Sequence, residues 1–175
     1  MKIITQTPID HLVSDPFRGH RSPLSGEISH GAFQSLAQGA KWREKLQRLD
    51  EELLKYPQID LPITHRYSRG VYSRTMYMPR GTILTGRIHK YSQINILLRG
   101  EVSVLTEEGM VRVKAPFVVE SPAGTKRAMY AHEDSEWMTI MGTDITDPDE
   151  ALDELTAWTY DEYDKFCIKQ ISQEN

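Results

Sequence analysis

The chain has 175 residues, a length that suits one domain with an appendage, and its 21 Lys and Arg against 25 Asp and Glu leave a net charge of −4. A slightly negative net charge does not indicate binding of a nucleic-acid polymer, which usually needs a basic surface. A single cysteine, Cys167, excludes a disulfide within the chain and fits a reducing compartment. No apolar run approaches the ~18 residues of a membrane span and no signal peptide is recognisable, so we expect a cytoplasmic protein.

Residues 1–28 are punctuated by prolines and glycines without a clear period, which predicts an irregular arm. Residues 29–56 are predicted to form a helix that Ser29 could cap and that Pro57 ends, with Gly39 as a weak point inside it. Its stronger half carries an apolar stripe at helical spacing, made of Trp42, Leu46, Leu49 and Leu53. We expect this stripe to pack on the rest of the domain; a free partner-binding helix is the alternative.

The region 58–145 has the pattern of many short strands separated by Gly and Pro turns. Within residues 70–78 two sets of side chains alternate, one made of Tyr72, Arg74, Met76 and Met78 and the other of Val71, Ser73, Thr75 and Tyr77. This period of two predicts a strand. Gly109 predicts a hairpin turn, and two further strands are expected on either side of residues 132–135. Many short strands with such turns suggest a jelly-roll barrel.

Residues 146–167 are predicted to form a C-terminal helix that Thr146 or Asp147 could cap, with Pro148 at the first helical position. Acidic residues early in this segment suit a helix N-terminus. The acidity of the chain is concentrated here, because residues 146–175 carry nine Asp or Glu and only two Lys. These carboxylates follow a pattern of helix solvation rather than that of a catalytic pair.

Two stretches of the chain share the spacing of a known pair of motifs. GTILTGRIHKYSQINILLRG, from Gly81 to Gly100, resembles the first cupin motif, G-x5-H-x-H-x3-E-x6-G. PFVVESPAGTKRAMYA, which starts at Pro116, echoes the second, G-x5-P-x-G-x2-H-x3-N, and keeps Pro122 and Gly124. Of the four metal-ligand positions, only one keeps a family ligand; the residues there are Arg87, His89, Gln93 and Arg127.

The chain therefore resembles the cupin superfamily of RmlC-like jelly rolls over about 70 residues, and short phrases are similar to small cupin-type proteins of tailed phages. The resemblance implies a mainly β, double-stranded β-helix barrel over residues 66–145. An N-terminal arm and helical extension, residues 1–65, would precede it. An acidic C-terminal helix and tail, residues 146–175, would follow it. The resemblance also implies that the four motif positions face an internal pocket. It further implies that the arm could exchange between the subunits of a homodimer or larger homo-oligomer.

The residue types at the four positions predict a cationic pocket without a metal. A guanidinium group has no lone pair to donate and stays protonated, so Arg87 and Arg127 would repel a divalent cation. The same groups attract phosphate or carboxylate, with bidentate geometry available. The alternative is structural, with these arginines paired to acids such as Glu101, Glu120 or Glu136.

Further residues could complete such a pocket. His89 could be a general base or a hydrogen-bond donor to a ligand, and the amide of Gln93 could bind an amide group or the edge of a base. Lys126 beside Arg127 could hold a phosphate. Aromatic side chains that could stack on a base or sugar ring are Tyr91, Tyr130 and Trp137. A metal is not favoured; if one binds, His89 and His132 are the candidate ligands, and core or surface roles remain open for all of these residues.

Three hypotheses follow for the function. The first is a small-molecule binding protein whose metal-free pocket holds an anion, preferably a nucleotide or nucleotide-like signal, which a phage protein could sequester from its host. The second is an enzyme, either a metal-independent sugar-nucleotide epimerase or isomerase with His89 as base, or a divergent metal enzyme. The third is a structural or assembly role in which the barrel is only a scaffold. No nucleophile constellation stands out in the sequence.

Overall fold

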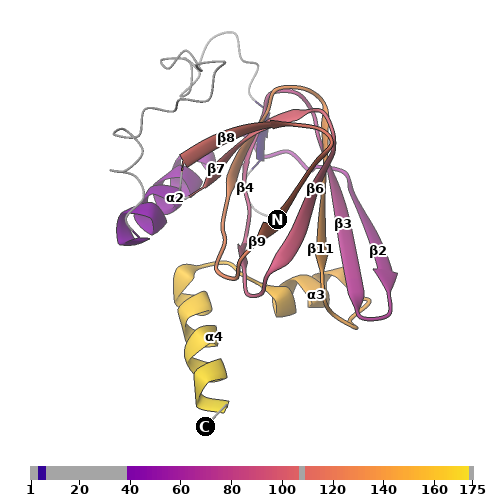
Figure 1. Cartoon of the computed structure of the whole chain (residues 1–175). Coiled ribbons are helices and arrows are strands. Elements are labelled where there is room, and N and C mark those ends of the chain that lie inside the picture. The colour runs from indigo at the N-terminus through magenta and orange to yellow at the C-terminus, as the bar shows by residue number, and fades with distance from the viewer. Residues whose placement is uncertain (1–3, 7–38, 107–108, 174–175) are drawn as a thin grey trace.

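The computed structural model describes residues 4–6, 39–106 and 109–173, which form a β barrel with helices at one side and at one end (Figure 1). The elements in chain order are β1 Ile4–Gln6, α2 Gly39–Leu53, β2 Ile63–Ser68, β3 Val71–Met78, β4 Thr82–Thr85, β5 Ile88–His89, β6 Gln93–Arg99, β7 Glu101–Thr106, β8 Gly109–Lys114, β9 Phe117–Ser121, β10 Ala128–Ala131, β11 Ser135–Met141, α3 Pro148–Leu155, β12 Thr156–Ala157 and α4 Tyr160–Gln173. No helix among the described residues is long and apolar enough to cross a membrane.

The strands form two five-stranded antiparallel sheets that enclose the core. Sheet A has the order β1-β4-β10-β7-β8, and sheet B has the order β2-β3-β11-β6-β9. From β6 to β11 the chain crosses repeatedly between the sheets, with β6 in sheet B, β7 and β8 in sheet A, β9 in sheet B, β10 in sheet A and β11 in sheet B. The resulting arrangement is that of a jelly roll, which agrees with the fold class predicted from the sequence.

Alternating side chains fill the space between the two sheets. In β3, Tyr72, Met76 and Met78 are buried, and in β11 every second residue from Ser135 to Met141 is buried. The core at one end of the barrel is aliphatic apart from Trp137, and its fully covered members include Met78, Leu97 and Val102. The side chains of the opposite set point outward, as the period of two requires.

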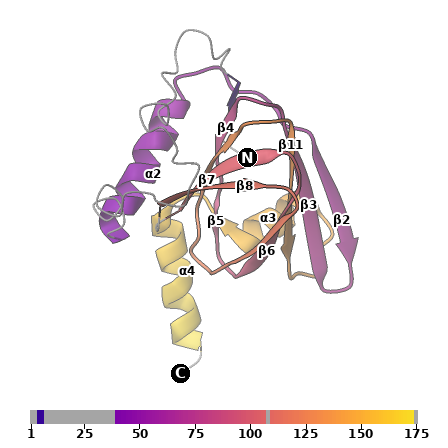
Figure 2. The ribbon, with the colours of Figure 1, turned by 45° about the horizontal axis from the view of Figure 1, so that its top comes forward.

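A helix and a short strand close the other end of the barrel. Asp147 caps α3 by accepting hydrogen bonds from the backbone N–H groups of Asp149 and Glu150, each at 3.0 Å. The apolar side of α3 packs against Tyr72 and Met141 at the ends of β3 and β11. Figure 2 looks obliquely into the barrel and shows α3 across its far end. Immediately after α3, β12 pairs with β5, with Thr156 opposite His89.

Helix α2 lies beside sheet A (Figure 1). Trp42 and Leu46 are fully buried against Ala128 of β10, which is the packing predicted for this apolar stripe. An ion pair between Lys126 and Asp50 adds a polar contact between the helix and the segment before β10. Helix α4, by contrast, projects away from the barrel and has no buried residue.

The observed elements differ from the predicted ones at the two ends of the chain. The single helix expected over residues 146–167 is two helices, because Thr156 and Ala157 form β12 and interrupt it. The helix expected over residues 29–56 is observed as α2, Gly39–Leu53, and residues 29–38 lie outside the described residues. The arm, residues 1–28, is described only at Ile4–Gln6, which forms a strand paired with β4 rather than irregular chain. Strand β2 begins at Ile63, three residues before the predicted barrel boundary.

Candidate functional site

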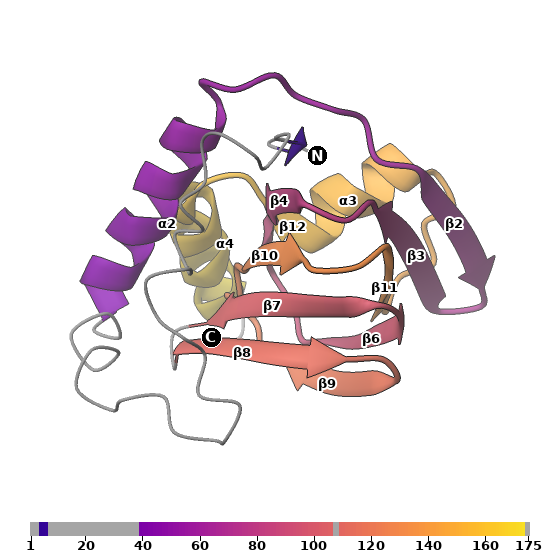
Figure 3. The ribbon, with the colours of Figure 1, turned by 90° about the horizontal axis from the view of Figure 1, so that it is seen from above.

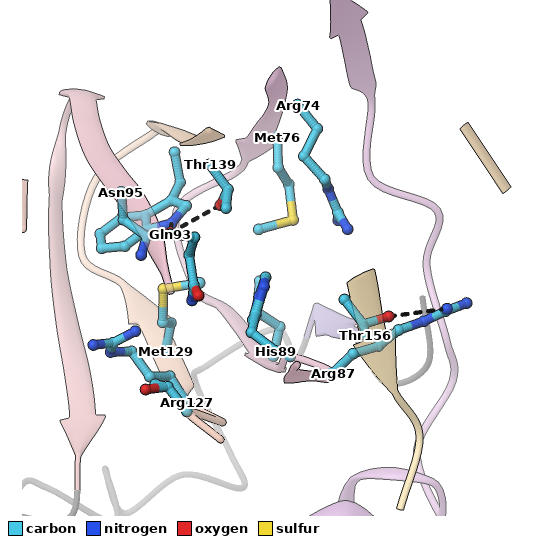
Figure 4. Close-up of a pocket in the computed structure, with 14 residues that line it drawn as sticks. Arg74, Met76, Arg87, His89, Gln93, Asn95, Arg127, Met129, Thr139 and Thr156 are labelled. Atoms are coloured by element: carbon cyan, nitrogen blue, oxygen red, sulfur yellow. Dashed lines mark hydrogen bonds between the residues drawn. The ribbon is translucent and has the colours of Figure 1, made fainter. Parts of the chain in front are cut away.

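A cavity of about 70 Å³ lies between the two sheets, near the end that α3 and β12 cover (Figure 4). All four motif positions line it, together with one of the three predicted stacking residues, Trp137. The complete lining is Arg74, Met76, Leu84, Gly86, Arg87, His89, Gln93, Asn95, Thr125, Arg127, Met129, Trp137, Thr139 and Thr156. Three guanidinium groups therefore border the cavity, and no Asp or Glu is among its lining residues.

Arg87 is held by the C-terminal elements. Its guanidinium donates to Oδ1 of Asp153 at 3.0 Å and to Oγ1 of Thr156 at 3.3 Å, and it lies 3.6 Å from the centre of the Trp158 ring. Figure 4 shows the side chain running past Thr156 and away from the middle of the cavity. The predicted structural role of an ion pair therefore applies to Arg87, although its partner is Asp153 and not one of the three glutamates considered.

Arg74 and Arg127 approach the cavity from opposite sides (Figure 4). Burial lowers the pKa of Arg74, with a further lowering by the nearby Arg87, and burial alone lowers the pKa of Arg127. Both groups nevertheless stay protonated at neutral pH, since the ordinary pKa of a guanidinium is above 12. Within the described residues, the Arg127 guanidinium forms no ion pair and no hydrogen bond. The cavity therefore presents positive charge whose hydration is incomplete.

His89 lies at the centre of this charge. Burial is the main cause that lowers its pKa to about 3, and the positive charges of Arg74 and Arg127 lower it further. The imidazole is therefore neutral at physiological pH, with one nitrogen that donates and one that accepts. Its place is fixed by the backbone, because the His89 N–H donates to Thr125 at 3.1 Å and its carbonyl accepts from Gly124 at 2.7 Å.

The side of the cavity formed by sheet B is a polar network around Asn95. The Asn95 Oδ1 accepts from Nε1 of Trp137 at 3.1 Å and from Oγ1 of Thr139 at 2.9 Å, and its Nδ2 donates to Oγ of Ser121 at 2.7 Å. Both polar atoms of this amide are therefore engaged by the protein. Gln93, two residues earlier on the same face of β6, is also buried, but its Oε1 has no hydrogen-bond partner among the described residues.

Several predicted site residues lie outside the cavity. Lys126 is buried and paired with Asp50 of α2. Tyr91 is exposed and packs edge-on against Phe166 of α4, with ring centres 5.4 Å apart. Tyr130 and His132 contact each other on the other face of sheet A, where Nε2 of His132 lies 2.7 Å from Oγ of Ser103.

Five polar residues that line the cavity were not predicted from the sequence, and they are Arg74, Asn95, Thr125, Thr139 and Thr156. The signal for Arg74 was present, because the alternation in β3 places it on the same face as Met76 and Met78. An arginine among inward apolar positions indicates a polar cavity behind them. Thr156 carried no such signal, since it reaches the site only through the pairing of β12 with β5.

The motif glycines mark the turns that bring these residues together. Gly81, Gly100 and Gly124 all have positive φ angles, between 82° and 86°. Gly81 and Gly100 bound the segment from β4 to β6 that carries His89 and Gln93, and Gly124 lies in the turn between β9 and β10, so the spacing of the motif and the jelly-roll strand order agree. The chain has a cupin fold.

No protein-family model matches the chain, and no curated protein matches its sequence. Among solved structures, the cupin fold is similar to a cupin superfamily protein from Desulfitobacterium hafniense, with 14% identity over 53% of this chain and 86% of that chain and a TM-score of 0.43. KdgF from Halomonas sp. matches with 15% identity over 51% and 86% and a TM-score of 0.44. An acetylacetone dioxygenase from Acinetobacter johnsonii matches with 17% identity over 47% and 61% and a TM-score of 0.39. Likeness at this level carries no information about activity.

The motif positions of this cupin fold do not fit a divalent metal. They offer one imidazole and one amide oxygen, and the other two positions hold guanidinium groups that would repel a cation. No group of three or more His, Cys, Asp or Glu side chains with the placement of a metal site occurs in the described part of the chain. His132, the other candidate ligand, is on the opposite face of sheet A from the cavity lining of β10, where its ring contacts Tyr130 and Ser103.

Proposed function

We propose that this protein is a small-molecule binding cupin whose metal-free pocket holds a small anion. The observation that carries the proposal is the charge of the cavity, which is bordered by three arginines and by no carboxylate. An anion that enters would replace lost hydration of these guanidinium groups with charge-assisted hydrogen bonds, which are about twice as strong as neutral ones.

Arg127 is the main anchor for the anion in this proposal. Arg87 is already engaged by Asp153 and stacked on Trp158, so it contributes charge near the cavity more than free donors. The Arg127 guanidinium, in contrast, has no partner within the described residues and five donors to offer. Arg74 supplies a second positive charge from the opposite side (Figure 4).

The volume of the cavity limits the size of the bound group. A space of about 70 Å³ accommodates on the order of five water molecules, at about 10–15 Å³ for each. A phosphate or a small carboxylic acid fits such a space. A nucleotide, the ligand class favoured by the sequence, fits only if its phosphate enters and the base and sugar stay outside.

Gln93 and His89 add a requirement on the anion. A primary amide and a neutral imidazole each offer both a donor and an acceptor, whereas a fully deprotonated oxyanion such as sulfate offers acceptors only. An acceptor left unpaired in a buried site costs about 1–3 kcal/mol. We therefore propose that the preferred anion carries a hydroxyl or an amide group beside its charge, so that the buried Oε1 of Gln93 gains a donor.

Binding is a better match to the site than proton transfer. A histidine with a pKa of about 3 is a weak base at neutral pH, and efficient general bases have a pKa near the working pH. This argues against the epimerase or isomerase alternative with His89 as the base. Sequestration of a nucleotide signal by a phage-encoded protein stays a prediction from sequence resemblance, and nucleotides form one arm of the test.

The test is a thermal-shift screen of metal-stripped protein against phosphate, sulfate, matched acids with and without a hydroxyl (glycolate and acetate, lactate and propionate), mononucleotides and cyclic dinucleotides. A ligand at about 100 times its dissociation constant adds about 2.7 kcal/mol to the free energy of unfolding. We expect a larger shift with glycolate and lactate than with acetate and propionate. Shifts with divalent metals alone would contradict the proposal.

Variants then connect the shift to the cavity. Arg127→Ala and Arg127→Gln should lose most of the anion-induced shift, whereas Arg80→Ala, an exposed arginine outside the cavity, should keep it. Gln93→Leu should reduce the preference for the hydroxylated acid of each pair while leaving binding of the plain acid. If the wild type and all four variants showed equal anion-induced shifts, the anion would bind elsewhere and the assignment of this cavity would be wrong.

A further inference from the structure

Two C-terminal side chains hold the guanidinium of Arg87 at the border of the cavity. It lies 3.6 Å from the centre of the Trp158 ring and donates from Nη1 to Oδ1 of Asp153 at 3.0 Å. The antiparallel pairing of β12 with β5 brings the ring there, since Trp158 directly follows β12 and Arg87 directly precedes β5. We call Trp158 and Asp153 the outer contacts of Arg87. They lie near the barrel end that α3 and β12 cover, whereas α2 lies to one side of the sheets (Figure 3).

The outer contacts use the Arg87 guanidinium incompletely. Both of its hydrogen bonds come from Nη1, and the one to Oγ1 of Thr156 is long at 3.3 Å. Its Nε is buried and has no partner among the described residues. The pair of Arg112 with Glu101 shows the contrast, because there Nε and Nη2 both donate to the carboxylate, at 2.9 and 3.0 Å. Arg87 therefore keeps buried donor capacity that is available to a bound anion.

The ion pair with Asp153 is also a weak one. The Asp153 side chain is 74% exposed, whereas that of Arg87 is 13% exposed. Water screens a pair with such an exposed partner, so the pair contributes little to holding the guanidinium in place. Stacking on the ring of Trp158 is the other main contact, and that ring is itself open to solvent on the protein surface.

Charge repulsion gives this side chain different preferences in an empty and in a filled cavity. The charge of Arg87 is near enough to disfavour that of Arg74, and Arg127 borders the same cavity. Without an anion, a third guanidinium inside the cavity is repelled, which favours the outward course of Arg87 seen in Figure 4. A bound anion removes this repulsion and offers charge-assisted hydrogen bonds where water screens little. The two positions therefore differ in their interaction with the anion, as a ligand-driven change requires.

We propose that Arg87 switches between two positions, one on Trp158 and Asp153 while the cavity is empty and one turned inward onto the anion when it is filled. The switch rests on the proposed function and adds its regulation. The outer contacts compete with the anion for one guanidinium, so they set the affinity of the site from outside the cavity. Trp158 loses its stacking partner when the anion binds.

Calorimetric titration of the full chain with glycolate and with inorganic phosphate tests the competition. Trp158→Leu removes the stacking without changing any charge. It should lower the dissociation constant of the bound probe about threefold, because fewer molecules hold Arg87 outward. Tyr91→Leu is the matched control, since Tyr91 is an exposed aromatic residue that packs on Phe166 rather than on an arginine. It should leave the dissociation constant unchanged.

A double variant and a spectroscopic signal connect the effect to Arg87. In Arg87→Gln the switch is absent, so the addition of Trp158→Leu should change the dissociation constant no further. Tryptophan fluorescence gives an independent measurement. Glycolate should change the emission of the wild type more than that of Trp158→Phe, in which Trp42 and Trp137 are the remaining tryptophans.

The outcomes separate the switch from the proposed function. If neither glycolate nor phosphate binds the wild type, the proposed function is wrong and the switch with it. If a probe binds, but Trp158→Leu binds it no more tightly than the wild type, the cavity holds an anion and the switch alone is wrong. Equal emission changes in the wild type and Trp158→Phe on binding would lead to the same conclusion.

Discussion

His89 links the chemistry of the pocket to the stability of the fold. An unperturbed histidine has a pKa of 6.5, whereas burial and the charges of Arg74 and Arg127 lower the pKa of folded His89 to about 3. Between these two values the unfolded chain binds a proton that the folded chain does not. Stability must therefore rise with pH in this window and become independent of His89 above pH 7.

We expect the free energy of unfolding of the wild-type protein to fall as the pH is lowered from 7 to 5, with a contribution from His89 that approaches about 1.4 kcal/mol per pH unit. His89→Gln, which keeps a polar side chain but cannot titrate, should show a shallower slope. His65 adds a slope of the same sign in both proteins, because burial also lowers its pKa. Urea denaturation at several pH values measures the difference, and equal slopes would contradict a buried, neutral His89.

The candidate site was partly predictable because the motif fixes positions on inward-facing strands. The resemblance to the two cupin motifs implied that Arg87, His89, Gln93 and Arg127 share a pocket, and all four line one cavity. The orientation of residues next to these positions in the sequence was not predicted correctly. Lys126 is next to Arg127 in sequence but turns toward α2, since adjacent residues of extended chain point to opposite sides.

At the scale of elements, the glycines of the motif are explained by the turns that they occupy. Gly100 joins β6 to β7 with a φ of 86°, and a Cβ atom there would lie 2.3 Å from Oγ of Ser135 and 2.6 Å from the carbonyl oxygen of Asp134. The turn therefore needs glycine for its backbone conformation and for lack of space. Gly70, between β2 and β3, has a φ of 71° but open space around it.

This contrast gives a matched pair of substitutions. Gly70→Ala should destabilise the protein by about 1–2 kcal/mol, the usual cost of a left-handed conformation for a residue with a Cβ. Gly100→Ala should cost clearly more, because the steric conflict with Ser135 and Asp134 adds to the same backbone strain. Urea denaturation of both variants at one pH checks the order. Similar losses in the two would show that the β6–β7 turn shifts easily to make room.

Strands were predicted correctly where buried and exposed side chains alternate regularly. The prediction of a single C-terminal helix was wrong, mainly because of a contact with a distant strand. A local signal for a second helix was present, because Thr159 and Glu162 have the spacing of a capping box and the Glu162 N–H donates to Oγ1 of Thr159 at 3.2 Å. The break at Thr156 and Ala157 arises because these residues pair with β5, and the backbone N–H of Lys90 donates to the Leu155 carbonyl at 2.9 Å. Strand pairing over more than 60 residues of chain outweighs a modest helix propensity.

At the scale of the whole molecule, the C-terminal segment has two parts with different roles. The first, α3 with β12, buries Leu152 and Leu155 at the barrel end, supplies Thr156 to the cavity and holds Arg87 through Asp153. The second, α4, has no buried residue. Asp164 of α4 pairs with Arg43 of α2, Tyr163 packs on Gly124, and Phe166 packs on Tyr91.

Shortened chains should separate these roles. A chain that ends at residue 159 loses α4 but keeps β12 and Trp158, so we expect a folded protein with a modestly lower melting temperature and the anion-induced thermal shift of the full chain. A chain that ends at residue 146 leaves Tyr72 and Met141 without α3 and β5 without its partner strand. Because buried apolar contacts and the ordering of His89 are lost together, it should melt non-cooperatively and show no shift with any anion. Loss of anion binding in the longer of the two chains, with its melting transition intact, would instead make α4 part of the pocket.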